Sequence, residues 1–95
     1  MPGALHAAVS TTVVNYTEDL KPDGRPAEVV AATAINNAAM AATDEAKKQM
    51  QKVANGREVK MWAVNLVPHL QPGIVTMTCT IFFEVLPVLL GPRAS

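Results

Sequence analysis

The 95-residue chain has few of the residues on which catalysis, metal binding and covalent cross-links depend. Its single cysteine, Cys79, excludes a disulfide framework within the chain. The two histidines, His6 and His69, have no second ligand at a metal-site spacing. The five glycines are scattered, so no glycine-rich phosphate loop is present. We therefore expect no catalytic residues, no metal site and no resident cofactor, in a protein that is not an enzyme.

Charged and aromatic residues are also scarce. Aromatic residues form 4% of the chain, which is too few for a platform on which nucleic-acid bases stack. Eight basic residues balance eight acidic ones, and this zero net charge excludes a strongly basic DNA-binding protein. Hydrophobic residues form 49%, too many for a disordered chain and more than one small core needs. We expect a single domain over residues 1–95 with surplus apolar surface.

No segment has the pattern of a targeting or membrane-spanning element. The N-terminus lacks the basic and apolar regions of a signal peptide, so we expect a cytoplasmic location. The longest apolar segment, residues 74–90, is interrupted by Glu84 and Pro87 and is marginal for the roughly 20 residues of a spanning helix. We interpret it as a buried strand followed by an apolar tail, and we expect no membrane association.

The C-terminal third predicts an antiparallel hairpin from about residue 58 to residue 86. Over 75–85, odd positions are apolar and even positions carry threonines or Glu84, with Phe82 as the exception, which is the pattern of a half-buried strand. Residues 59–67 are apolar at both odd and even positions, apart from Lys60 and Asn65, as in a strand that is covered on both faces. A turn over 69–73 joins the two strands. Pro68, directly before the turn, and Pro72, within it, are expected to lie outside the hydrogen-bonded ladder.

The alanine-rich segment 31–55 predicts a helix, because apolar residues recur at steps of three and four. This apolar stripe comprises Ile35, Ala39, Ala42, Ala46, Met50 and Val53. The helix ends at the Asn-Gly pair 55–56. Its beginning has two interpretations: Pro26 in the first helical position gives a helix of about 30 residues, whereas a short strand at 28–31 places the start near Thr33.

The N-terminal third has two interpretations as well. Residues 9–20 fit either one face of a helix or a β-branched strand, and residues 21–26 form a loop. Both interpretations predict an α/β (α+β) two-layer sandwich. A mostly antiparallel sheet of three or four strands, including the C-terminal hairpin, packs against one long alanine-rich helix. If residues 9–20 are helical, the sandwich has a short N-terminal helix as well.

The charges are sorted along the chain. Residues 1–46 hold two basic and six acidic residues, and residues 47–95 hold six basic and two acidic ones. Five of the cations fall close together in sequence: Lys47, Lys48, Lys52, Arg57 and Lys60. The simplest interpretation is that these cations stabilise the C-terminal end of the helix. The alternative is a modest nucleic-acid-binding patch that contacts phosphates.

Several apolar residues have no evident cover within one chain. Trp62 is the sole tryptophan, and we expect it to pack in a core or an interface, with a ligand-stacking surface as the alternative. Phe82 lies on the threonine face of its strand. Val88, Leu89 and Leu90 follow the last strand in a proline-bounded tail. These five residues are candidate ligand or interface positions, and the surplus of apolar surface predicts a homo-oligomer, with a dimer as the commonest closed form.

Two family resemblances accompany this pattern. Residues 27–30 (AEVV) and 34–41 (AINNAAMA), followed by the hairpin, resemble the Alba-like superfamily, especially its stage V sporulation protein S branch. That resemblance implies a helix at 9–20, a strand at 28–31, a second helix at 34–54, dimerisation and association with nucleic acid. The basic loop that archaeal Alba proteins carry after their first strand has no counterpart at residues 6–10.

The long-helix alternative gives the order strand, helix, hairpin, which is similar to the dodecins. That resemblance implies a flavin stacked at Trp62, although the helix here is longer than in that family. Three hypotheses follow: an Alba-like oligomeric binding or scaffold protein with nucleic acid as its ligand, an oligomer that binds a flavin-like small molecule, and a structural component that binds another protein.

Overall fold

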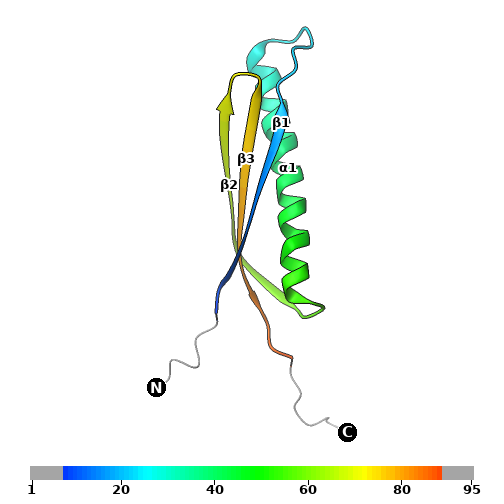
Figure 1. Ribbon diagram of the computed structural model, residues 1–95, viewed down its shortest axis with the longest axis vertical. Coiled ribbons are helices and arrows are strands. Elements are labelled where there is room, and N and C mark those ends of the chain that lie inside the picture. Colours follow the sequence, from blue (N-terminus) through cyan, green and yellow to red (C-terminus); the bar gives the residue numbers. More distant parts are fainter. Residues whose placement is uncertain (1–7, 89–95) are drawn as a thin grey trace.

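The computed structural model describes residues 8–88 and has one helix packed on one three-stranded sheet (Figure 1). The elements, in chain order, are β1 (Ser10–Asp19), α1 (Ala27–Ala54), β2 (Val59–Gln71) and β3 (Ile74–Val85). The strands are ordered β1-β3-β2, and both pairings are antiparallel. The predicted two-layer α+β sandwich with a C-terminal hairpin is confirmed, with three strands in this part of the chain.

The sequence left two interpretations for residues 9–20 and two for the start of the long helix. In the structure, residues 10–19 form the strand β1, and the helix is the long one. β1 pairs with β3 along its whole length, from Ser10 opposite Phe83 to Asp19 opposite Ile74. The carbonyl oxygen of Pro26 accepts hydrogen bonds from the next turn of backbone, so α1 begins directly after that proline. A helix at 9–20 and a strand at 28–31, as the Alba-like assignment implies, are therefore wrong. Pairing with β3 outweighs the helical spacing of the apolar residues in β1.

The buried stripe of α1 follows a strict four-residue step. Its residues are at most 5% exposed: Ala34, Ala38, Ala42, Ala46, Met50 and Ala54. A row with this step inclines by about 26° to the helix axis, which lets the helix follow the twist of the sheet. The predicted stripe is confirmed at its centre. Ile35 and Ala39 lie half-buried beside it, and Val53 is 52% exposed, so its assignment to the stripe is wrong.

β3 is the central strand, and its odd positions form the sheet side of the core. These residues are at most 1% exposed: Val75, Met77, Cys79, Ile81 and Phe83. The even positions face away from α1 and are half-buried between the neighbouring strands. The predicted alternation of β3 is confirmed. The thiol of Cys79 lies 3.9 Å from the hydroxyl of Thr43 on α1, inside the core, as expected of a packing residue.

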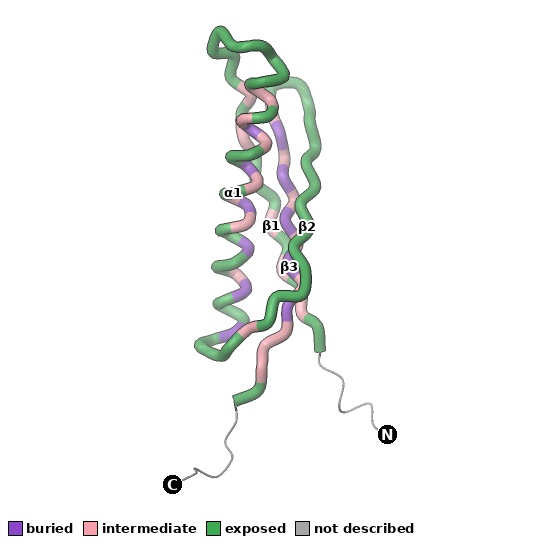
Figure 2. The backbone as a smooth tube through the Cα atoms, turned by 180° about the vertical axis from the view of Figure 1, so that it is seen from behind, coloured by how far each residue is buried: buried purple, intermediate pink, exposed green. Residues whose placement is uncertain are grey.

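β2 lies at the edge of the sheet and is exposed along its length (Figure 2). α1 packs against β1 and β3 and hardly touches β2. The prediction that residues 59–67 are covered on both faces is therefore wrong for the single chain. The strand also continues through Pro68 to Gln71, and only Pro72 and Gly73 form the turn, because an edge strand tolerates a proline.

Among the helices of residues 8–88, none is long and apolar enough to cross a membrane.

Candidate functional site

A bulge in β2 decides which of its side chains face α1. Met61 is paired with Phe83 and Ala63 with Phe82, so Trp62 is an extra residue in the strand. An inserted residue shifts the alternation of all later side chains by one position. Odd-numbered residues face α1 before the bulge, and even-numbered residues face it afterwards. This register places the apolar residues of β2 on one side.

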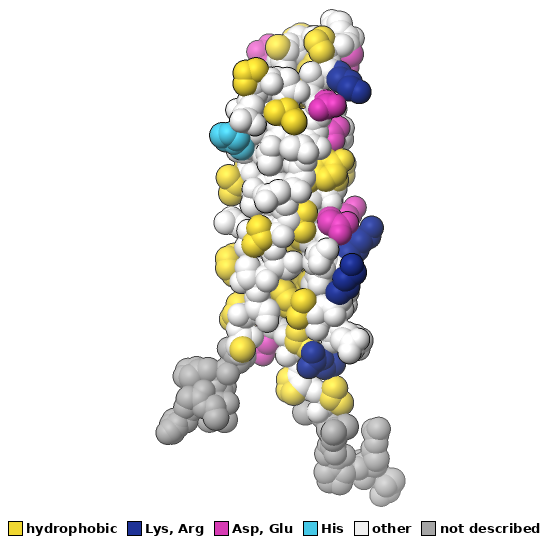
Figure 3. All heavy atoms as spheres, viewed as in Figure 1, with side chains coloured by type: hydrophobic (Ala, Val, Ile, Leu, Met, Phe, Trp, Pro, Cys, Tyr) yellow, Lys and Arg dark blue, Asp and Glu magenta, His cyan; other side chains and the backbone are white. Residues whose placement is uncertain are grey.

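That side, which we term the inner face of β2, carries five apolar residues in sequence: Met61, Val64, Leu66, Pro68 and Leu70. Their partners on β3 are the buried odd-numbered residues of that strand. The apolar side of the sheet therefore continues from β3 onto β2, where α1 no longer covers it. The Met61, Val64, Leu66 and Leu70 side chains are 44%, 41%, 41% and 52% exposed. In the view of Figure 3, hydrophobic side chains recur along the margin that β2 occupies in Figure 1.

The flank of α1 forms a wall beside the inner face of β2. Ala39, Met40, Thr43 and Asp44 line a groove of about 300 Å³ together with Leu66. Two of these wall residues are small, and Met40 is 62% exposed. The groove therefore has an apolar floor and a low, mostly apolar wall.

The opposite side of the sheet, its outer face, is more polar. Thr76, Thr78 and Thr80 run along its centre, and the Thr78 hydroxyl donates a hydrogen bond to Asn15 Oδ1 over 2.7 Å. Val67 and His69 of β2 lie on this face and are exposed. Such a mixed surface is typical of the solvated side of an antiparallel sheet.

Trp62 lies on the outer face, among polar partners. Its indole N–H donates a hydrogen bond to Glu84 Oε1 over 3.2 Å, and Lys60 Nζ lies 4.4 Å from the ring centroid. The side chain is 53% exposed, so the expected core position is wrong for the single chain. Phe82 is half-buried on the same face, opposite the bulge. Trp62 is therefore held by a cation–π contact with Lys60 and by a charge-assisted hydrogen bond to Glu84.

The structure divides the five cations of the predicted basic patch. Arg57 Nε donates to the Ala54 carbonyl oxygen over 3.0 Å, so this side chain caps the end of α1. Lys60 lies over Trp62, on the outer face of the sheet. The other three, Lys47, Lys48 and Lys52, line one shallow surface depression on α1. A basic surface of three lysines therefore remains together.

The tail after β3 is only partly described. Leu86 N donates to the Glu58 carbonyl oxygen over 2.8 Å, which extends the pairing of β3 by one residue. Val88 is 59% exposed and lines a depression with Arg57 and Pro87. Leu89 and Leu90, the other predicted interface residues of the tail, lie outside the described residues.

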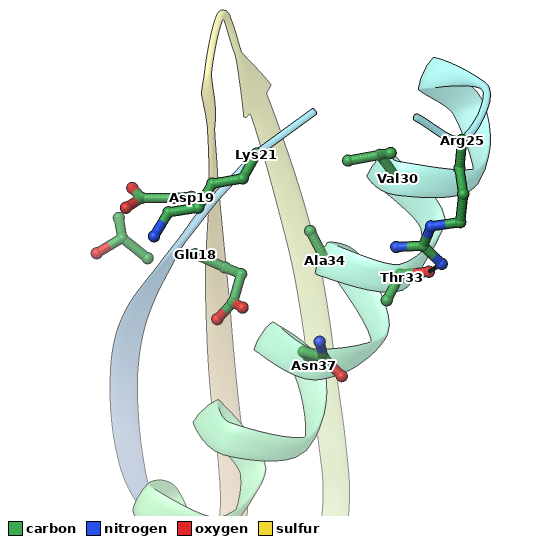
Figure 4. A pocket seen from close by; sticks show the side chains of 9 residues that line it. Glu18, Asp19, Lys21, Arg25, Val30, Thr33, Ala34 and Asn37 are labelled. Carbon is green, nitrogen blue, oxygen red and sulfur yellow. Dashed lines mark hydrogen bonds between the residues drawn. The ribbon is translucent and has the colours of Figure 1, made fainter. Parts of the chain in front are cut away.

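A polar cleft that the sequence did not indicate lies between the end of β1 and the first turns of α1 (Figure 4). It has a volume of about 390 Å³, and its polar and charged lining residues are Thr17, Glu18, Asp19, Lys21, Arg25, Thr33 and Asn37. No sequence motif marks it, since its residues come from a strand, a loop and a helix.

The guanidinium of the cleft residue Arg25 already has a partner. Arg25 Nε donates hydrogen bonds to both carboxylate oxygens of Asp23, and Nη2 lies 2.6 Å from Oδ2. These hydrogen bonds, together with the opposite charges, lower the pKa of Asp23 and raise that of Arg25. Two cations and two carboxylates line the cleft itself, which gives it no net preference for ions of one sign. Across residues 8–88, no three histidine, cysteine, aspartate or glutamate side chains are grouped so that they could hold a metal ion.

Comparisons with family models, with curated proteins and with solved structures give no match to this chain.

Proposed function

We propose that this chain is a non-enzymatic subunit of a homo-oligomer that acts as a binding or scaffold protein. One observation carries the proposal: six large apolar side chains of β2 are exposed, on a strand that α1 leaves uncovered. They are Met61, Trp62, Val64, Leu66, Val67 and Leu70, between 41% and 53% exposed. Four of them, Met61, Val64, Leu66 and Leu70, form one apolar row on the side of the sheet that faces α1. Contiguous apolar surface of this kind marks interaction sites in folded proteins.

The energetics favour an oligomer in which several of these side chains are buried together. Full burial of a valine, leucine or methionine side chain contributes about 1.5–3 kcal/mol, so a half-exposed one contributes about 1 kcal/mol on association. The side of the sheet that faces α1 offers six such side chains: Met61, Val64, Leu66, Pro68 and Leu70 of β2, and Met40 of α1 beside them. In two subunits these give roughly 12 kcal/mol, against an association cost of about 4–15 kcal/mol. At the lower end of that cost the net gain is about 8 kcal/mol, which corresponds to a dissociation constant in the micromolar range.

Sedimentation equilibrium of the purified chain tests this proposal. We expect a concentration-dependent oligomer that dissociates as the protein is diluted through the low micromolar range. We expect a dissociation constant in the micromolar range. A molecular mass that stays that of a monomer up to about 200 μM would therefore contradict the proposal.

Trp62, with its partners Glu84 and Lys60, supports a second candidate function, a small-molecule-binding oligomer. The indole ring is half-exposed, while Glu84 and Lys60 hold its orientation. A fixed, accessible aromatic ring is a suitable stacking surface for a planar ligand of the flavin type. The order strand, helix, hairpin, which is similar to that of the dodecins, also supports this candidate.

Fluorescence titration with riboflavin tests the second candidate, because Trp62 is the only tryptophan. Saturable quenching supports it. A Lys60→Ala variant keeps the tryptophan and removes the cation, and is expected to bind more weakly. Linear quenching without saturation, identical in the two proteins, would reflect collisions and contradict the candidate.

Association with nucleic acid rests on fewer residues than the sequence implied. Lys47, Lys48 and Lys52 lie together, whereas Arg57 and Lys60 have intramolecular partners. Three phosphate contacts would give weak and strongly salt-dependent binding. A gel shift at low salt that is lost in a variant with the three lysines changed to glutamine would support this association, and the absence of a shift would contradict it.

A further inference from the structure

We propose that a second copy of this chain docks on the inner face of β2 and the adjoining flank of α1, so that the two inner faces pack against each other. This inference rests on the proposed homo-oligomer and specifies its surface. The outer face of the sheet, which carries Trp62, then stays free.

The inner face suits a second copy because it carries no charge. Between Met61 and Leu70 its residues are all apolar, and Asp44 is the one charged residue among those that line the groove. A partner with a charged surface would have to bury its charges here without a counter-charge, which is costly. A second inner face brings only apolar side chains to the contact.

The layer that α1 forms over β1 and β3 is vacant above the inner face of β2, and a strand could occupy it. A helix and a second sheet both pack about 10 Å above a sheet, and α1 occupies that layer only over β1 and β3. A twofold axis parallel to the strands would place the partner's β2 in the vacant position beside α1, and would place this β2 beside the partner's α1. The small residues Ala39 and Thr43 on the wall allow a strand to approach closely.

The edge of β2 is a poorer docking site than its inner face. Edge-to-edge pairing needs an unbroken row of backbone N–H and C=O groups. Pro68 lacks an N–H, and the bulge at Trp62 interrupts the strand near its other end. Only the five residues between them, 63–67, could pair regularly. Prolines and bulges at edge strands oppose such pairing.

The available area predicts a weak dimer. A 13-residue strand is about 44 Å long, and the floor and wall of the groove together are about 10 Å wide, the width of a helix. This gives roughly 440 Å² for each copy, and about 900 Å² in total, which is at the lower end for specific interfaces. The dimer is therefore expected to dissociate in the micromolar range.

Two neighbouring residues of β2 give a matched test. Leu66 on the inner face is 41% exposed, and Val67 on the outer face is 53% exposed. We expect Leu66→Glu to raise the dimer dissociation constant at least tenfold and Val67→Glu to leave it unchanged, in sedimentation equilibrium from about 1 to 200 μM. Circular dichroism checks that both variants are folded.

The outcomes separate this inference from the proposed function. A wild-type monomer would overturn both. An oligomer that Val67→Glu dissociates and Leu66→Glu does not would overturn only the inner-face assignment and would place the contact on the outer face. An oligomer that neither variant weakens would also overturn the assignment.

Cysteine cross-linking provides a second measurement if Leu66→Glu fails to fold. A twofold axis parallel to the strands brings each residue of the inner face opposite the same residue of the partner, at the distance of about 10 Å between facing sheets. This is too far for a direct disulfide, so Leu66→Cys is expected to be cross-linked between subunits by a short bis-maleimide reagent. Cys79 is fully buried and does not compete. Val67→Cys is the control. Cross-linking of Val67→Cys without Leu66→Cys would overturn the inference.

Discussion

Replacing Ala42 by leucine tests whether the close packing of α1 on the sheet depends on its alanine stripe. Ala42 is 0% exposed and belongs to the core cluster formed with the buried side chains of β3. Alanine and leucine have similar helix propensities, so the substitution changes the helix–sheet contact and hardly changes the helix itself. The larger isobutyl side chain must displace α1 or force strained rotamers, at a cost of about 1–3 kcal/mol.

Thermal unfolding at a fixed protein concentration measures this cost. A loss of about 2 kcal/mol lowers the melting temperature of a domain of this size by roughly 8–16 °C. Ala32→Leu is the matched control, because Ala32 lies on the same helix and is exposed, and we expect a change within about 0.5 kcal/mol. If Ala42→Leu melted at or above the wild-type temperature, the alanine stripe would not set the helix–sheet distance and the packing argument would be refuted.

Three further predictions concern the core, the hairpin turn and one ion pair. Phe83 is 0% exposed, so Phe83→Ala should lower the free energy of unfolding by about 3–5 kcal/mol in urea titration; a loss below 1 kcal/mol would contradict its place in the core. Gly73 has a φ of 79° and nothing within 4 Å of an added Cβ, so Gly73→Ala should cost about 1 kcal/mol through backbone strain alone, and Gly73→Asn should cost less. The pKa of Asp23 is lowered by Arg25, so the pair stabilises the fold above the ordinary value of 3.8 and this contribution is lost as pH falls through the lower folded pKa. Carboxyl chemical shifts should show an Asp23 pKa below 3.8 that rises in Arg25→Gln; an unchanged pKa in the variant would exclude the ion pair as its cause.

The sequence predicts the fold best where burial follows from local alternation. β3 is buried on one face and half-buried on the other, so its period of two is visible in the residues themselves. The end of α1 was predictable too, because Asn55 adopts the left-handed conformation that follows many helices. The choice of strand for β1 was not, since its pairing with β3 is a long-range interaction that no local pattern contains.

The candidate surface was predictable in composition and not in position. The two-sided apolar pattern of 59–67 is that of an interior strand, yet the order β1-β3-β2 places β2 at the edge. The bulge at Trp62, which moves the later even-numbered residues to the side of α1, has no sequence signal such as a glycine. The five cations were adjacent in sequence, but the reversal of the chain after α1 separates them between a helix face, a helix end and the outer face of the sheet.

The mismatch between the sequence of β2 and its position in the sheet is itself the best support for a partner. An edge strand that faced only water would gain nothing from apolar residues on the side of the helix, and polar residues there would make the chain less prone to aggregate. α1 packs over β1 and β3 and leaves β2 largely uncovered. In the proposed dimer, the flank of α1 and the apolar strand beside it form two halves of one contact surface. The exposed apolar side chains of β2 are unfavourable in a monomer, and a second copy that completed the layer would bury them.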